Sequence, residues 1–325
     1  MTKQEVWLLA LMLQIFYISG WVNAEDNGSQ STELNHFLSI STETWKQPLF
    51  AANRRIEFEP TGFNLHYSIT INDTWFLGAG VGRFDDTIRD GRLIGDFTNK
   101  SLNFGAGFIY NNWWLSFWYN QQKEETHLDN EGRVFAEITA EADYSAYAIE
   151  LTRPFKDYEY ASGSALLLEA GGNFEYQEQD SKQTIILRTE RGSSAESNQF
   201  DGNGWLAGVT FSASYFYLLG GPEVATNDRN EIVATLSVNW SEPLTGDTQG
   251  SSVAGFRTRE GRINRVRREQ TVEDNEGSGQ LEIRLSWLIG PLSLNAGVAF
   301  PFDSDFNGNT MDDQKSLYAG ADIVF

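Results

Sequence analysis

Residues 316–325, SLYAGADIVF, end the chain in a strand pattern with two chemically different faces. Successive side chains of a strand point to opposite sides, so one face carries Leu317, Ala319, Ala321, Ile323 and Phe325 and the other carries Ser316, Tyr318, Gly320, Asp322 and Val324. A chain terminus normally frays into solvent unless it is tied down. In a closed membrane barrel the last strand pairs with the first, which places the terminus in the wall. The ending therefore favours a closed barrel.

The same ten residues resemble the C-terminal insertion signal of bacterial outer-membrane β-barrels, which finishes on an aromatic residue, usually Phe, after alternating apolar residues. The resemblance extends to porin-like proteins in general and to no particular subfamily. It implies a location in the bacterial outer membrane, contact with outer-membrane lipids and lipopolysaccharide, and recognition of the last strand by the barrel-insertion machinery.

The N-terminus has the pattern of an export signal. Lys3 precedes an apolar run from Val6 to Ile18, and Val22, Asn23 and Ala24 form a small-residue cleavage signature. We expect a signal peptide over residues 1–24 and a single barrel domain over residues 25–325. The alternative is an uncleaved anchor, but the run is shorter than the roughly 20 apolar residues that a helical span needs.

The composition narrows the class of protein further. The net charge of −21 argues against nucleic acid as a partner. The chain has no cysteine, so no disulfide contributes to stability in an exported protein. Aromatic residues make up 14% of the chain while mean hydropathy is only −0.39. Such a mixture suits a barrel, in which polar lumen residues alternate with lipid-facing ones.

Alternation of apolar and polar residues recurs along the chain and predicts an all-β, up-and-down antiparallel transmembrane barrel. We expect strands at 63–71, 75–84, 101–110, 113–121, 144–153, 164–176, 205–219, 231–240, 280–289, 292–300 and the C-terminal end. An even number of strands requires one more near residues 36–50, where the pattern is weak. Twelve strands is the prediction, with ten or fourteen as alternatives.

The connections between these strands alternate in length, as periplasmic turns and extracellular loops do. Short connections are expected at 72–73, 111–112, 154–163 and 290–291, with a somewhat longer one near 220–230. Long polar loops are expected at 85–100, 122–143, 177–204, 241–279 and 302–315. A secreted soluble β-sandwich or soluble β-barrel is the alternative. Tryptophans near strand ends favour the membrane barrel because they match interfacial girdles; they are Trp75, Trp113, Trp205, Trp240 and Trp287.

The polar face of the strands predicts the residues that line the lumen. They are Asn64, His66, Ser68, Thr70, Asn103, Glu150, Glu169, Glu175, Thr210, Ser212, Ser237, Asn239, Glu282, Arg284, Asn295 and Asp322. Carboxylates outnumber Arg284 in this set, and rings of Asp or Glu favour cations in channels. We therefore expect a mildly cation-selective passive channel for small polar solutes. The alternative is a narrow or plugged interior in which these groups bond to one another.

An arginine-rich segment stands out in this acidic chain: residues 256–268 contain Arg257, Arg259, Arg262, Arg265, Arg267 and Arg268. Guanidinium groups match phosphate in a bidentate manner, so the segment is expected either to contact lipopolysaccharide phosphates or to fold inward as a constriction. A solvated loop balanced by nearby glutamates is the plain alternative.

The last polar segment, residues 303–314, contains half of a calcium-binding pattern. Asp303, Asp305, Asn307 and Asn309 are candidate ligands around Gly308. Gln314 stands where a bidentate Glu is expected, and the helical flanks of an EF-hand are missing. No other cofactor is expected.

The sequence does not predict an enzyme. Only three histidines are present, and His66 and Ser68 lie roughly 6–7 Å apart along one strand, which is too far for direct proton transfer. The text around His66 also lacks the Asn-Gly of barrel-embedded phospholipases. A closed barrel that serves as a surface-interaction protein through its loops is the main alternative to a channel, and a barrel-embedded lipid hydrolase is the less favoured one.

Overall fold

A computed structural model describes residues 34–51, 54–71, 74–130, 135–159, 164–189, 192–219, 230–258, 263–273, 278–302, 305–306, 309–310 and 315–325. The expected signal peptide lies outside this range. The wall of the molecule is formed by β1 (Leu34–Trp45), β4 (Thr61–Ile71), β5 (Trp75–Asp90), β6 (Leu93–Tyr110), β7 (Trp113–Asn130), β8 (Phe135–Glu159), β9 (Ala165–Thr189), β10 (Gly192–Leu218), β11 (Asn230–Thr258), β13 (Ser278–Ile289), β14 (Leu292–Phe302) and β17 (Ser316–Val324). Shorter strands are β2 (Gln47–Ala51), β3 (Arg54–Phe58), β12 (Ile263–Glu273), β15 (Asp305–Phe306) and β16 (Asn309–Thr310).

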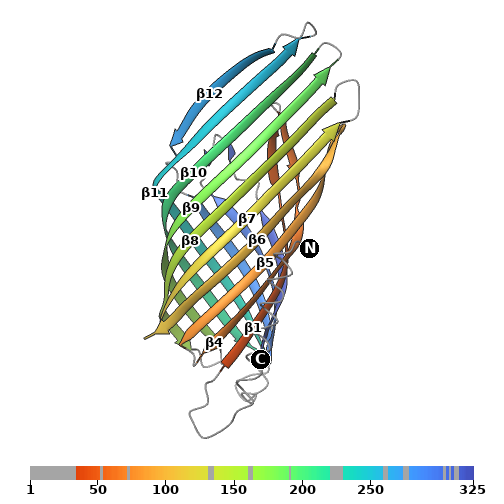
Figure 1. Ribbon diagram of the computed structural model, residues 1–325. Helices are drawn as coiled ribbons and strands as arrows, with labels where there is room; N and C mark the ends of the chain where they lie inside the picture. The colour runs from red at the N-terminus through yellow and green to blue at the C-terminus, as the bar shows by residue number, and fades with distance from the viewer. Residues whose placement is uncertain are drawn as a thin grey trace, which may run out of the picture.

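The wall is a closed antiparallel barrel of 12 strands, as the sequence predicted. Each strand pairs with its neighbour in the chain, and β17 returns to pair with β1, so that Ser39 faces Asp322. The C-terminus lies beside β1, at the end of the barrel opposite β12 (Figure 1). The backbone N–H of His36 donates to the carbonyl of Phe325 at 2.9 Å, and Phe325 N–H donates to the His36 carbonyl at 3.0 Å. The terminal residue is therefore part of the closing seam.

Two tight turns are described at the end of the barrel that holds the C-terminus, which we call the short-turn end; they join β6 to β7 and β13 to β14. Asn111 and Asn112 both have positive φ, at 50° and 64°, as a two-residue hairpin requires. Gly290, with φ of 54°, serves the turn between β13 and β14 in the same way. The predicted 72–73 turn lies outside the described residues.

The opposite end, called the extended end, differs from the prediction of long loops. Most of residues 85–100, 122–143, 177–204 and 241–258 is strand, so β5 to β11 continue well beyond the remaining strands (Figure 1). The reason is that these polar segments pair in register with one another; β7 and β8, for example, remain paired from Trp114–Thr152 to Asn130–Ala136. A polar composition does not by itself indicate an irregular backbone.

Residues 36–50, where one strand was expected, contain most of β1 and the beginning of β2. β1 ends at Trp45, and β2 then pairs with β3 in a separate hairpin that precedes β4. In Figure 1 this hairpin lies behind the extensions of the wall strands. Side chains of β3 pack on the inner face of those extensions in a cluster that we call the mouth cluster. It consists of Ile56, Phe58, Ile88, Phe97, Leu128, Ile138 and Ile185, none more than 7% exposed.

Many large apolar residues outside the mouth cluster are exposed and face away from the interior. Trp75, Leu77, Phe117 and Phe211 are between 48% and 58% exposed, and on each strand such residues alternate with inward polar ones. This outward band is the lipid-facing surface of a transmembrane barrel. The molecule thus has a polar interior in its membrane part and a small apolar core at the extended end.

Candidate functional site

The inner face of the barrel is the candidate site, because strand pairing brings the predicted polar residues together on it. His66 faces Ser39 on one side and Gly80 on the other, and Ser237 lies between Ser212 and Glu282. All sixteen predicted lining residues occupy this face: Asn64, His66, Ser68 and Thr70 on β4, Asn103 on β6, Glu150 on β8, Glu169 and Glu175 on β9, Thr210 and Ser212 on β10, Ser237 and Asn239 on β11, Glu282 and Arg284 on β13, Asn295 on β14, and Asp322 on β17.

The inward carboxylates are held by hydroxyl and amide donors from other strands of the wall. Ser212 Oγ donates to Glu169 at 3.1 Å, and Asn295 Nδ2 donates to Asp322 at 2.6 Å. Further donors are Ser116 to Glu150 at 3.2 Å, Tyr144 to Glu175 at 3.0 Å, and Tyr318 to Glu282. Neutral donors stabilise a carboxylate without cancelling its charge. These hydrogen bonds fix the carboxylate side chains against the wall.

Positive charge is sparse on the same face. Among the described side chains of the twelve wall strands, Arg284 is the one inward-facing Arg or Lys, as the pairing of Thr235 with Arg284 shows. Glu282 lies two residues away on the same face of β13.

Glu43 and Tyr318 belong to the inner face but were not among the predicted lining residues. Glu43 pairs with Tyr318 across the seam between β1 and β17. The ring of Tyr318 lies against Gly297 of β14, where any larger side chain would overlap it, and from there its hydroxyl reaches Glu282. Glu43 could have been found from the register of the first strand, which the weak pattern at 36–50 concealed.

Aromatic rings line another arc of the lumen, across β4 to β7. The Trp118 ring lies over Gly105, and its centroid is 5.9 Å from the His66 ring and 6.0 Å from the Phe76 ring. Residues 113–121 carry tryptophan on both faces, so alternation did not reveal that Trp118 points inward. Gly105 explains the arrangement, because the ring needs a residue without a side chain beneath it.

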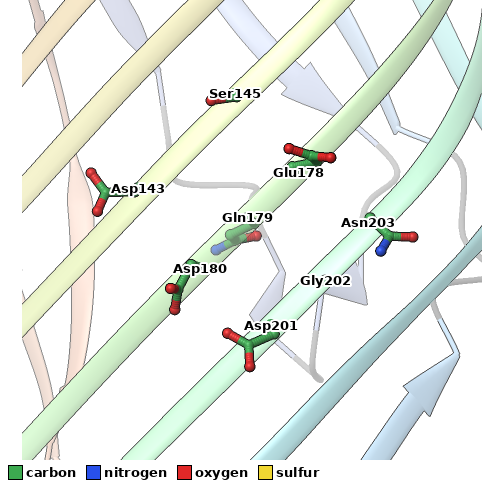
Figure 2. Close-up of a pocket in the computed structure, with 8 residues that line it drawn as sticks. All are labelled: Asp143, Ser145, Glu178, Gln179, Asp180, Asp201, Gly202 and Asn203. Atoms are coloured by element: carbon green, nitrogen blue, oxygen red, sulfur yellow. The ribbon is translucent and has the colours of Figure 1, made fainter.

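A separate depression of about 510 Å³ lies on the outer face of the β8–β10 extensions (Figure 2). Asp143 pairs with Asp180, and Asp180 pairs with Asp201, so three carboxylates lie side by side. Partial burial, followed by the neighbouring Asp201, raises the pKa of Asp180. No group of three or more His, Cys, Asp or Glu in the described part of the chain is arranged to hold a metal ion.

The two remaining sequence-predicted sites are described only in part. The backbone of Arg257, Arg265, Arg267 and Arg268 runs in the β11–β12 hairpin at the extended end, while Arg259 and Arg262 lie outside the described residues. Of the calcium candidates, Asp305 and Asn309 lie in the β15–β16 pair, and Asp303 and Asn307 fall outside the described range. No helix in the described residues is long and apolar enough to cross a membrane.

The geometry defines a class of protein, the closed transmembrane barrels of the outer-membrane type, and comparison with solved structures agrees. The chain is similar to the beta domain of the Bordetella autotransporter BrkA, with a TM-score of 0.53 and 12% identity over 90% of this chain and 100% of that one. It is also similar to the translocator domain of the autotransporter NalP from Neisseria meningitidis, with a TM-score of 0.48 and 10% identity over 98% and 97% of the two chains. A deletion mutant of the TodX monoaromatic hydrocarbon channel gives a TM-score of 0.49 and 8% identity over 90% and 88%. No family model and no curated protein sequence matches the chain. The likeness to the BrkA beta domain shows the fold and no subfamily.

Proposed function

We propose that this protein is an outer-membrane channel for the passive passage of small polar solutes, with a preference for cations. The short-turn end faces the periplasm in this proposal, and the extended end faces outward. The observation that carries it is the charge of the lumen: inward carboxylates such as Glu169, Glu175, Glu282 and Asp322 face a single inward arginine among the described wall residues.

The route of a cation follows from the arrangement of these groups. Carboxylates lie on β8, β9, β13 and β17, and hence around much of the circumference instead of in one strong binding site. Distributed weak sites favour entry of a cation and also permit its release, which conduction requires. The aromatic rings around Trp118 offer their π faces to the same ions. The size of the solutes that can pass is limited at the extended end, where β3 occupies part of the inner face.

Liposome swelling tests the proposal directly. Barrels in liposomes are exposed to small solutes of equal size that are cationic, neutral or anionic, and the swelling rates are compared. The wild-type chain is expected to admit the cationic solute fastest. Exchanging Glu169, Glu175 and Glu282 for Gln should remove that preference while neutral solutes pass as before. Equal rates for the cationic and anionic solutes in the wild type would contradict it.

A second candidate function is favoured by the mouth cluster. If the hairpin closes the interior completely, the barrel is a scaffold whose long outer extensions bind other surfaces. In that case no solute enters liposomes, and removing residues 47–58 opens the barrel. A lipid hydrolase is the third candidate. It would depend on His66 and Ser68, which share the inner face of β4, and hydrolysis of phospholipid by the wild type but not by His66→Ala would support it.

A further inference from the structure

Inward glycines on β5 and β6 leave part of the lumen wall without side chains of its own. Gly78 and Gly80 occupy successive inward positions of β5, and Gly78 pairs directly with Gly105 of β6. Rings from the strands on either side cover these bare positions. A Cβ atom at Gly105 would overlap the Trp118 ring, and one at Gly78 would lie 3.1 Å from the His66 ring. Each ring therefore has one face against the wall and the other turned to the lumen.

The rings continue from Trp118 toward the short-turn end. The Phe76 ring lies over Gly107 of β6, where any larger side chain would overlap it. Its centroid is 6.0 Å from that of Trp118 and 5.0 Å from that of Trp114. Trp114 is the second residue of β7 and thus lies close to the tight turn that precedes this strand. Trp114, Phe76 and Trp118 form a continuous run of rings, which we call the aromatic track.

Packing within the wall explains only part of the aromatic track. A ring that covers a glycine of a neighbouring strand stabilises the sheet, and this accounts for Phe76, which is 5% exposed. It does not account for Trp114, which is 44% exposed on an inner face that is otherwise mostly polar. Apolar surface left in water is unfavourable. A solute that covers the Trp114 ring would therefore gain free energy at this point of the lumen.

A carboxylate lies beside the aromatic track. Ser116 occupies the inward position between Trp114 and Trp118 and is 2% exposed. Its hydroxyl accepts a hydrogen bond from Trp118 Nε1 at 3.1 Å and donates one to Glu150 at 3.2 Å. Arg284, the one inward Arg or Lys among the described wall residues, is on β13, on the other side of the barrel. β7 to β11 separate β13 from β6 in one direction, and β5, β4, β1, β17 and β14 separate them in the other.

Ring faces and a carboxylate together suit one class of solute. A ring face attracts a cation, and aromatic rings recognise quaternary ammonium groups in this way. A cation that spreads its charge over methyl groups holds water weakly, so it loses less hydration than potassium when it contacts a ring. From these features we propose that Trp114, Trp118 and Glu150 form a lumen binding site for small quaternary ammonium cations. This inference rests on the proposed function for its role in passage and names the class of cation.

Binding of choline to the purified barrel in neutral detergent tests the site, with saturation-transfer NMR titration as the readout. The neutral probe is 3,3-dimethylbutan-1-ol, which has the shape of choline without its charge. Choline should bind the wild type more tightly than this alcohol does. Trp114→Leu should weaken choline binding about tenfold, and Glu150→Gln should weaken binding of choline but not of the alcohol. Trp113→Leu is the matched control, because Trp113 is 40% exposed on the outer face of the same strand, and it should bind choline normally.

Two results would overturn the site: equal affinity of the wild type for choline and the alcohol, or an equal loss of choline binding in Trp113→Leu and Trp114→Leu. Migration of every variant as a folded, heat-modifiable barrel on gels keeps the comparison valid. Conductance separates this inference from the proposed function. If the wild type prefers potassium to chloride but binds no choline, the site is wrong and the channel stands. If choline binds as expected and no ion passes, the channel is wrong and the site stands.

Discussion

Replacing Phe58 with Ala should release the β2–β3 hairpin from the extended end of the barrel. Phe58 is 5% exposed, and its ring lies 4.8 Å from the Phe97 ring. Truncating a buried Phe to Ala typically costs about 3–5 kcal/mol. Some of this free energy will be recovered as the hairpin moves. We therefore take about 3 kcal/mol as the loss in the free energy of docking of the hairpin. A difference of 1.4 kcal/mol is about tenfold in an equilibrium constant, so the undocked population should rise on the order of 100-fold.

Cysteine labelling measures this population, because the natural chain has no cysteine. Leu128 is fully buried in the mouth cluster, so a Leu128→Cys reporter reacts with a maleimide only when the hairpin is undocked. When docking is fast relative to labelling, the rate follows the undocked population. The rate should rise on the order of 100-fold in the Phe58→Ala background. Phe63→Ala is the matched control, since Phe63 is 46% exposed on the lipid-facing side. A reporter that reacts equally fast with and without Phe58 would refute the docking of the hairpin.

Three other predictions concern the wall itself. His36→Ala removes a 2.7 Å hydrogen bond with the Tyr67 hydroxyl and a stacked contact with Phe325. Urea unfolding should therefore show a free energy of unfolding lower by about 2 kcal/mol. An unchanged midpoint would mean that the side chain of His36 does not stabilise the seam. Gly105→Leu places a side chain where the Trp118 ring lies, and overpacking of this kind should cost about 1–3 kcal/mol, with a red-shifted tryptophan emission if the ring is displaced. The raised pKa of Asp180 means that its contribution to stability is complete below the ordinary value of 3.8 and is lost as pH rises through the raised value. Asp180→Asn should therefore be more stable than the wild type at neutral pH and equal to it below pH 3.8; a variant less stable at neutral pH would contradict this sign.

The sequence predicted the membrane part of the barrel well because lipid and lumen impose opposite demands on alternate residues. Residues 281–287 show this: Leu281, Ile283 and Leu285 face outward, and Glu282 and Arg284 face inward. Every predicted lining residue follows the same rule. The final Phe325 indicated a seam, and its backbone bonds to His36 confirm one.

The parts that the sequence did not reveal depend on contacts between distant segments. The extensions of β5 to β11 are strands because they pair with each other, and a polar composition conceals that pairing. The β2–β3 hairpin is held by Ile56 and Phe58 against strands that lie far along the chain. Trp118 points inward because Gly105 on the adjacent strand leaves room for its ring. None of these partners can be found from the period of a single segment.

The sign of the zero-current potential across a planar bilayer tests the central claim most directly. A single barrel is placed between two potassium chloride solutions of different concentration, and the potential that stops the current is measured. An acidic lumen predicts a zero-current potential with the same sign as the potassium equilibrium potential. This potential should move toward zero when Glu169, Glu175 and Glu282 are exchanged for Gln. A zero-current potential with the sign of the chloride equilibrium potential in the wild-type channel would contradict the account.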